Sequence, residues 1–190
     1  MIGELNVRPD IHGIIIQLPL EDPTKTEAVL SLVDPSKDID GLGNDAIYDP
    51  ATPTAILWLL AAYNIELRGK HVLIVGQGRL VGAPLAKMLT DSGVDVETAD
   101  DTARNLAELC QNAQILISAA GSANLITDKM VSVDAIIVDA GTSVGNSEVV
   151  GDVSDEVRAR PDVMITPKKG GVGPLTVAAL FENLLKATRK

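Results

Sequence analysis

Two hydrophobic patterns alternate along most of the chain. From residue 71 onward, short runs rich in β-branched residues are separated by stretches whose apolar side chains recur at helical spacing. The strand-like runs cover residues 71–75, 94–98, 115–118, 135–139 and 163–166. Helices are expected over residues 82–92, closed by Gly93 as a left-handed C-cap, over residues 105–111, and as a short turn near residues 127–131. Strands alternating with helices in this way predict an α/β fold, a doubly wound parallel sheet of right-handed βαβ units.

The two ends of the chain follow other patterns. A fully apolar run over residues 13–16 predicts a strand, and a helix is expected over about residues 25–33. Thr52 and Pro53 indicate the N-cap and first residue of an apolar helix that ends near Asn64.

The change of pattern predicts three parts. We expect part of a smaller α/β domain over residues 1–52 and a Rossmann-type domain with a bridging helix over residues 53–173. Pro174 begins an amphipathic helix over residues 174–190, which we expect to return to the smaller domain.

Composition and charge restrict the partners. The chain has 190 residues and a formal net charge of −10, which disfavours a nucleic-acid partner, because phosphate backbones are bound by clustered Lys and Arg. No apolar run is long enough to span a bilayer, and Met1 is not followed by a basic stretch and an apolar core. We therefore expect a cytoplasmic protein with no membrane partner. The single Cys110 lies in a helical pattern and is interpreted as a buried structural thiol.

A glycine-rich loop follows the first strand of the predicted sheet. Gly76 permits a tight turn, Gly78 lets the backbone approach a pyrophosphate, and Gly82 lets the next helix lie close to the strand. The other cofactor candidates in this loop are Gln77, Arg79 and Val81. Because a strand and a helix flank the motif, we predict a nicotinamide dinucleotide site, NADP or NAD.

Acidic residues near the end of the second strand bear on the choice of cofactor. Asp100 and Asp101 would accept hydrogen bonds from the adenosine ribose and repel a 2′-phosphate, which favours NAD slightly. Arg79 and Arg104 could instead pair with a phosphate, or be solvated surface charges. Two turns of small residues follow later strands, at the edge of the sheet where such folds bind ligands. Unless they are ordinary tight turns, they add four cofactor candidates: Ala120, Gly121, Gly141 and Thr142.

Three segments carry a family resemblance. They read HGIIIQLPL over residues 12–20, KDIDG over residues 37–41 and PKKGGVGPLT over residues 167–176, with further matches at residues 50–53, 76–84 and 151–153. Together they resemble methylenetetrahydrofolate dehydrogenase/cyclohydrolase. The resemblance implies oxidation of 5,10-methylenetetrahydrofolate with a nicotinamide cofactor and hydrolysis of the methenyl product to 10-formyltetrahydrofolate. It also implies a folate cleft between the two domains, and a homodimer.

The same resemblance assigns site residues. Gln17 matches the glutamine near the reacting pterin, and Asp40 matches the aspartate that holds the pterin ring, where a carboxylate can accept two parallel N–H bonds. The implied catalytic residues are thus Gln17 and Asp40, and the substrate contacts add Leu18, Pro19, Gly171, Val172, Gly173 and Pro174, with Thr176 on the cofactor side. Without a ligand, Gln17 would be a polar residue at a strand end and Asp40 a turn-capping aspartate.

One departure from the family concerns catalysis. The family's Tyr-x-x-x-Lys motif, whose lysine is the general acid/base, is not found, since Tyr48 is followed four positions later by Thr52 and Tyr63 by Leu67. We expect folate turnover by these 190 residues alone to be absent or very weak. The alternatives are a non-catalytic nucleotide-binding or dimerising module, or a different small-acid dehydrogenase, which would leave the folate-type segments unexplained.

Other departures from the family change the charged residues expected near the ligands. Gln77 and Gly78 replace the family's Arg-Ser, and Asp100 lies in the segment that replaces its Cys-His-Ser, which favours NAD or a weakened NADP site. Lys168 and Lys169 replace Val-Pro, and could bind a folate glutamate tail, substitute for the lysine, or be solvated.

Overall fold

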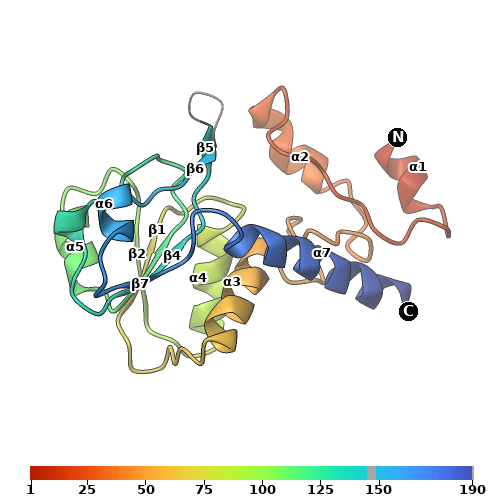
Figure 1. Cartoon of the computed structure of the whole chain (residues 1–190). Coiled ribbons are helices and arrows are strands. Elements are labelled where there is room, and N and C mark those ends of the chain that lie inside the picture. The colour runs from red at the N-terminus through yellow and green to blue at the C-terminus, as the bar shows by residue number, and fades with distance from the viewer. Residues whose placement is uncertain (145–148, 190) are drawn as a thin grey trace.

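The larger part of the molecule is built on a five-stranded parallel sheet (Figure 1). The computed structural model describes residues 1–144 and 149–189. The strands are β1 (Val72–Val75), β2 (Val96–Ala99), β3 (Ile115–Ser118), β4 (Ile136–Asp139) and β7 (Met164–Ile165), in the order β2-β1-β3-β4-β7. Every neighbouring pair is parallel. The predicted α/β fold is therefore confirmed, and each of its five strand-like runs overlaps one of these strands.

Helices cover both faces of this sheet. Alternate residues of β1 point to opposite sides, so Val72 and Ile74 join a core with α3 (Ala51–Ala62) and α4 (Gly82–Asp91). Leu73 and Val75 join a second core. The remaining elements on that side are α5 (Leu106–Asn112), η2 (Asp128–Met130) and α6 (Asp155–Arg158).

Cys110 on α5 lies in the second core, as expected. It is fully buried, and burial raises the pKa of its thiol to about 11. Gly93, after α4, has a φ of 77° and is the left-handed residue predicted there.

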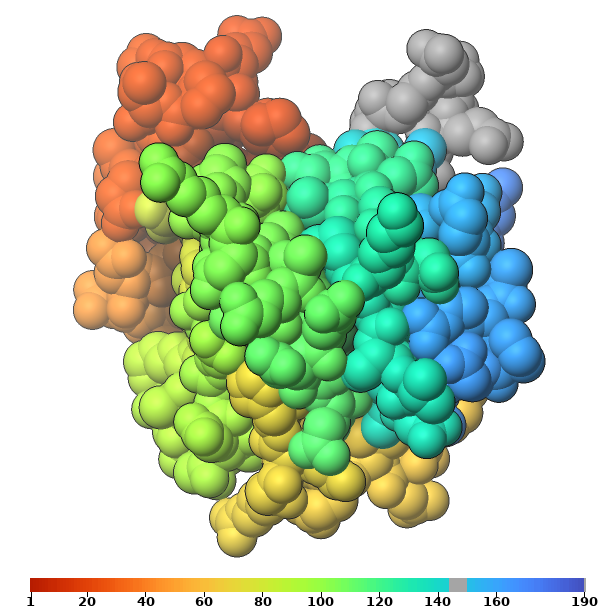
Figure 2. All heavy atoms as spheres, turned by 90° about the vertical axis from the view of Figure 1, so that its left-hand side faces the viewer, coloured from red at the N-terminus to blue at the C-terminus, as the bar shows by residue number. Residues whose placement is uncertain are grey.

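The N-terminal segment forms a lobe beside the sheet, red and orange in Figure 2. It contains α1 (Ile2–Asn6), η1 (Pro23–Lys25) and α2 (Thr26–Leu30). The strand predicted over residues 13–16 is wrong, because in the described part of the chain only a single bridge joins Ile14 to Asp38, and one bridge does not make a strand ladder. The helix predicted over residues 25–33 is also shorter, because α2 ends at Leu30 and the Leu32 and Val33 amides donate to carbonyls three residues back rather than four.

The last helix, α7 (Val172–Thr188), returns to this lobe. Asn183 donates from Nδ2 to the carbonyl oxygens of Ile39 (3.0 Å) and Asp49 (2.9 Å). A small apolar cluster of Ile39, Tyr48 and Ala187 lies beside these bonds.

Two predicted helix starts are corrected. Helix α3 begins at Ala51, because the Thr54 amide already donates to the Pro50 carbonyl, and α7 begins two residues before Pro174. In both helices a proline occupies the first turn, where its missing N–H is not needed. An antiparallel pair, β5 (Ser143–Val144) and β6 (Val149–Val150), was not predicted.

Candidate active site

The glycine loop after β1 is shaped by close backbone approach. Gly76 has a φ of 93°, and a Cβ there would lie 2.6 Å from backbone atoms of Ala119 and Ala120. A Cβ on Gly82 would lie 1.8 Å from the Gly76 carbonyl oxygen. Both positions therefore require glycine, as the motif predicted. A Cβ on Gly78 would meet nothing within 4 Å, so the middle of the loop faces open space.

A cavity of about 430 Å³ lies beside this loop, at the carboxyl ends of β4 and β7. It brings together predicted residues from three segments of the chain: Val81, Gly141, Thr142, Gly171, Val172, Gly173, Pro174 and Thr176. Its lining also includes Thr52, Arg158 and Lys168. The carboxyl edge of an open parallel sheet is where such folds bind ligands.

A second cavity, of about 590 Å³, separates the N-terminal lobe from the glycine loop. Leu18 and Pro19 line one side, Arg79 and Leu80 the other. Leu80 and Thr142 line both cavities, so the two spaces adjoin. The lobe and the sheet domain thus form the two walls of one cleft.

An ion pair crosses this cleft. The Arg79 guanidinium contacts the Glu27 carboxylate of α2, and Glu27 also accepts a 2.7 Å hydrogen bond from Nδ2 of Asn44. These contacts hold the pKa of Glu27 below its usual value, with Arg79 as the main cause. Arg79 was predicted to contact the cofactor, and in this structure it is engaged by the opposite lobe.

Gln17 and Asp40 lie in the N-terminal lobe, and neither lines the two cavities described above. The exposed Gln17 side chain donates from Nε2 to the Leu18 carbonyl oxygen at 2.9 Å. Asp40 is half-buried, and burial, with the nearby charge of Asp38, raises its pKa to about 6. Asp38 itself is buried and accepts hydrogen bonds from the Gly41 and Gly43 amides.

The two aspartates after β2 are exposed and lie outside the same two cavities. Asp100 accepts hydrogen bonds from the Thr102 hydroxyl (2.7 Å) and amide (2.9 Å), which lower its pKa. Asp101 accepts a 2.9 Å hydrogen bond from the Ser122 hydroxyl. The Asp100 contacts are those of a turn-capping aspartate.

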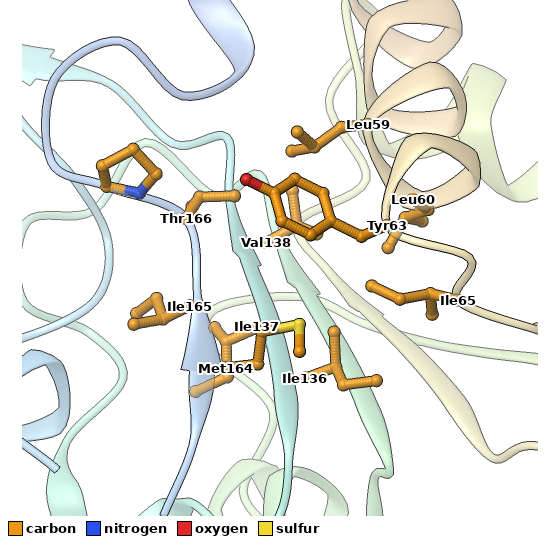
Figure 3. A pocket seen from close by; sticks show the side chains of 11 residues that line it. Leu59, Leu60, Tyr63, Ile65, Ile136, Ile137, Val138, Met164, Ile165 and Thr166 are labelled. Carbon is orange, nitrogen blue, oxygen red and sulfur yellow. The ribbon is translucent and has the colours of Figure 1, made fainter. Parts of the chain in front are cut away.

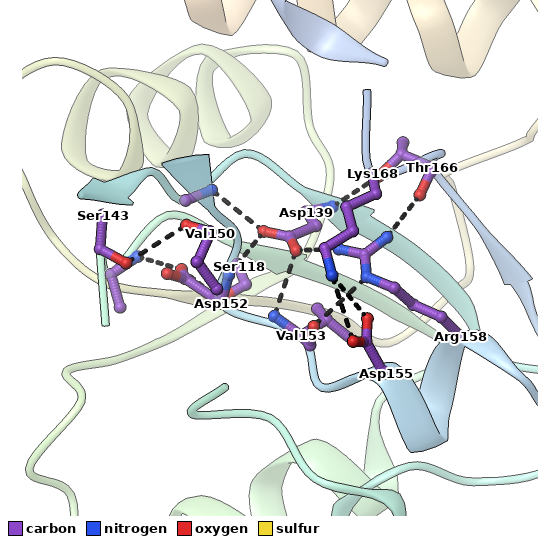
Figure 4. A network of polar contacts seen from close by, with 12 residues as sticks. Ser118, Asp139, Ser143, Val150, Asp152, Val153, Asp155, Arg158, Thr166 and Lys168 are labelled. Atoms are coloured by element: carbon purple, nitrogen blue, oxygen red, sulfur yellow. Dashed lines mark hydrogen bonds and ion pairs between the residues drawn. The ribbon is translucent and has the colours of Figure 1, made fainter. Parts of the chain in front are cut away.

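A buried carboxylate holds the turn after β3. Asp152 is fully buried and accepts a 2.7 Å hydrogen bond from the Ser118 hydroxyl (Figure 4). It also accepts hydrogen bonds from the Ala120 and Ser122 amides, both at 2.8 Å. A longer bond comes from the Gly121 amide. The predicted cofactor turn is therefore fixed by a side chain that the sequence reasoning did not assign, although its Gly-Asp-Val segment was noted as a family match.

A second carboxylate holds the turn after β4, since Asp139 accepts a 3.2 Å hydrogen bond from the Gly141 amide. Asp139 accepts hydrogen bonds from the Asp152 and Val153 amides, both at 3.1 Å, and pairs with Arg158 of α6 (Figure 4). Burial raises the pKa of Asp139, and these amides and Arg158 oppose that shift. A Cβ on Gly141 would lie 2.0 Å from the Asp152 carboxyl group, so this turn needs glycine for close packing.

Lys168 lines the 430 Å³ cavity but is paired. Its Nζ lies 2.9 Å from Oδ1 of Asp155 on α6. Lys168 is one of the two lysines that replace the family's Val-Pro, and this ion pair joins it to α6 of the sheet domain.

A third cavity is small and almost entirely apolar (Figure 3). Its volume is about 100 Å³, and it lies between α3 and strands β4 and β7, where Tyr63, Met164 and Thr166 line it. It is too small for a dinucleotide. Among the described residues, no group of three or more His, Cys, Asp or Glu side chains is arranged to hold a metal ion, and no helix has the length and apolarity of a membrane span.

Known proteins match the chain over its whole length. Residues 50–190 match the NAD(P)-binding domain of tetrahydrofolate dehydrogenase/cyclohydrolase, and residues 1–40 match its catalytic domain. The bifunctional protein FolD of Lactobacillus acidophilus is 40% identical over 199 residues, which cover 100% of this chain and 70% of the relative.

Solved structures agree with this match. The bifunctional enzyme FolD of Campylobacter jejuni superposes with a TM-score of 0.89 at 36% identity, covering 99% of this chain and 71% of that one. A Trypanosoma brucei FolD, described as complexed with NADP cofactor and inhibitor, has a TM-score of 0.88 at 32% identity, with 98% and 69% covered. The chain therefore belongs to the tetrahydrofolate dehydrogenase/cyclohydrolase (FolD) family.

Proposed function

We propose that the chain provides the cofactor site and one wall of the folate site for two reactions. The first is oxidation of 5,10-methylenetetrahydrofolate to the methenyl form, and the second is hydrolysis of that product to 10-formyltetrahydrofolate. The observation that carries the proposal is the cleft itself, since the 430 Å³ cavity at the carboxyl ends of β4 and β7 adjoins a second cavity walled by Leu18 and Pro19. We propose residues 1–52 and 174–190 as the folate side and residues 53–173 as the cofactor side.

The glycine loop would hold the cofactor diphosphate. The open space over Gly78 and the amides at the start of α4 suit an anion, because helix N-termini carry partial positive charge. The 430 Å³ cavity, with Gly141, Thr142 and Thr176 in its lining, would then take the nicotinamide end. When bound, this ring accepts a hydride from the folate methylene carbon.

Asp40 and Gln17 would orient the pterin. Because the pKa of Asp40 is about 6, its carboxyl group is mostly ionised at neutral pH and can accept two N–H bonds from the 2-amino-pyrimidinone edge. The Gln17 amide would leave its present bond to the Leu18 carbonyl and turn toward the folate.

We propose NAD as the preferred cofactor, although the Trypanosoma brucei relative is described with NADP. Gln77 offers no positive charge for a 2′-phosphate, and Asp100 and Asp101 place two carboxylates after β2. Replacing both aspartates with Asn should shift the preference toward NADP.

Folate turnover should be weak for the 190 residues alone. No Tyr-x-x-x-Lys motif occurs in them, and Lys168 is paired with Asp155 rather than free to act as a general acid/base. The alternative, a non-catalytic nucleotide-binding module, predicts the same cofactor binding with no turnover under any condition.

Calorimetric titration with NAD and with NADP tests the cofactor site, and an absorbance assay for reduced cofactor with methylenetetrahydrofolate tests turnover. Binding of NAD more tightly than NADP supports the proposal. If neither dinucleotide binds at millimolar concentration, the cofactor site is wrong.

We also propose a cytoplasmic homodimer that pairs through the sheet domain. Strand β7 is an edge strand in the described sheet. It carries the exposed apolar side chain of Met164, and the exposed Tyr63 side chain lies nearby. Met164→Glu should convert the dimer to a monomer in sedimentation analysis, and an unchanged mass would exclude this edge as the interface.

A further inference from the structure

The positive charge of the glycine loop is paired with a carboxylate of the opposite lobe. The loop runs from Gly76 to Gly82 between β1 and α4, and Arg79 is its only cationic residue. The Arg79 guanidinium pairs with the Glu27 carboxylate of α2, and both residues line the cavity of about 590 Å³ between the lobes. The charge that would attract an anion to this loop is therefore already neutralised from across the cleft.

This interlobe ion pair is easily exchanged. The side chains of Arg79 and Glu27 are 41% and 49% exposed. An exposed ion pair contributes little free energy and weakens as the salt concentration rises, because water and ions screen it. A diphosphate offers the guanidinium more negative charge than one carboxylate, and it can accept two parallel N–H bonds from it. A diphosphate on the loop can therefore displace Glu27 from Arg79.

Glu27 is held in place for this contact by its own lobe. Its Oε1 accepts a 2.7 Å hydrogen bond from Nδ2 of Asn44, while its Oε2 contacts Arg79. Both contacts lower the pKa of Glu27, so its carboxyl group is ionised at neutral pH. Lys25, the nearest cation along the chain, pairs with Asp22 instead. The carboxylate is thus directed across the cleft rather than used within α2.

Asn44 connects the interlobe ion pair to the turn that carries Asp40. It follows Gly43, whose amide donates to the buried Asp38 carboxylate at 2.7 Å. The Gly41 amide donates to the same carboxylate at 3.1 Å. Contacts therefore run from the glycine loop to the turn beside the proposed pterin contact, so a change at the loop has a physical route to that turn.

We propose that Glu27 is an internal competitor for a diphosphate: its pair with Arg79 holds the N-terminal lobe against the glycine loop, and a diphosphate bound on that loop takes Arg79 and releases the lobe. Release would widen the cavity of about 590 Å³ that the pair crosses. That the diphosphate belongs to a dinucleotide rests on the proposed function. The competition for Arg79 does not, because any diphosphate offers the same charge.

Distances between the two lobes test the ion pair without substrate. Val7→Cys and Val133→Cys place one spin label on the N-terminal lobe and one on the sheet domain, since both side chains are exposed. The native Cys110 is buried with a raised thiol pKa, so it resists labelling. In pulsed electron paramagnetic resonance at low salt, Glu27→Gln should broaden the distance distribution at least about twofold. Inorganic pyrophosphate should broaden the wild-type distribution in the same way.

Calorimetric titration with inorganic pyrophosphate tests the competition. Glu27→Gln removes the competitor, so pyrophosphate should bind about two- to fivefold more tightly than it does to wild type at low salt. In an Arg79→Gln background, Glu27→Gln should change this affinity no further, because the two residues act through one contact.

Glu21→Gln is the matched control. Glu21 is an exposed carboxylate of the same lobe, and it forms no ion pair with any residue that the structure describes. Its replacement removes the same charge and should leave both the distance distribution and the pyrophosphate affinity unchanged. Thermal unfolding of each variant shows whether it is folded.

Three results would overturn the inference. One is the same distance distribution for wild type and Glu27→Gln. Another is a pyrophosphate affinity that Glu27→Gln does not raise, including no binding to either protein. The third is an equal effect of Glu21→Gln, since the loss of one negative charge would then explain the result. If pyrophosphate behaves as expected but neither NAD nor NADP binds, the competition stands and the proposed function is wrong.

Discussion

Replacing Gly82 by Ala tests the packing of the glycine loop most directly. The new Cβ would lie 1.8 Å from the Gly76 carbonyl oxygen, so the loop or the start of α4 must move by more than about 1 Å to restore contact distance. Backbone shifts of this kind cost about 3 kcal/mol. For a domain of this size, that corresponds to a fall in Tm of roughly 6–12 °C. The displaced helix amides should also weaken cofactor binding at least about tenfold.

Gly78→Ala is the matched control, because its Cβ would meet no atom within 4 Å. We expect its unfolding free energy to stay within about 0.5 kcal/mol of wild type. Its cofactor affinity should nevertheless fall, since the methyl group occupies space proposed for the diphosphate. Scanning calorimetry and cofactor titration separate the two effects. A Gly82→Ala protein that melts within about 2 °C of wild type would refute the steric argument. Normal cofactor binding by Gly78→Ala would refute the placement of the diphosphate.

Three further predictions concern charged side chains. Because the folded-state pKa of Asp40 is raised to about 6, its ionisation should cost stability as pH rises from about 4 to 6, and the cost should persist above that range. Asp40→Asn should therefore melt at a higher temperature than wild type at pH 7.5 but not at pH 4, and an equal difference at both pH values would contradict this. Glu27→Gln should release Arg79 for the cofactor phosphates and tighten binding by up to about fivefold at low salt in calorimetry, whereas weaker binding would show that the pair helps to shape the site. Asp152→Asn should lower the unfolding free energy in urea by about 2–3 kcal/mol, because an amide cannot accept all four hydrogen bonds, while the exposed Asp155→Asn control should change it by less than about 1 kcal/mol.

The sheet domain was predictable because its signals are local. Strands β1, β3 and β4 lie in short apolar runs, and Gly93 marks the end of α4 by its left-handed conformation. The roles of Gly76 and Gly82 also follow from sequence, since strand, turn and helix are contiguous there. The first residues of the helices were less predictable, because a proline can occupy any of several positions in the first turn of a helix.

The N-terminal lobe was predicted less well because its structure depends on distant contacts. Residues 13–16 have a strand-like pattern but find only one bridge, to Asp38. Asp139 and Asp152 gave no local signal of their roles, since their donors come from turns elsewhere in the chain. A pattern shows that a residue is polar or apolar, and only the fold shows which amides surround a carboxylate.

Buried carboxylates hold the turns at the cofactor edge, whereas an exposed ion pair crosses the cleft beside it. Asp152 and Asp139 hold the turns after β3 and β4 by accepting hydrogen bonds from backbone amides of these turns, and both carboxylates are buried. Across the cleft, the Arg79–Glu27 ion pair is exposed, so it holds the N-terminal lobe only weakly. The proposed cofactor surface is therefore held by buried groups, whereas the proposed folate side is held to α7 by the Asn183 hydrogen bonds to the Ile39 and Asp49 carbonyls.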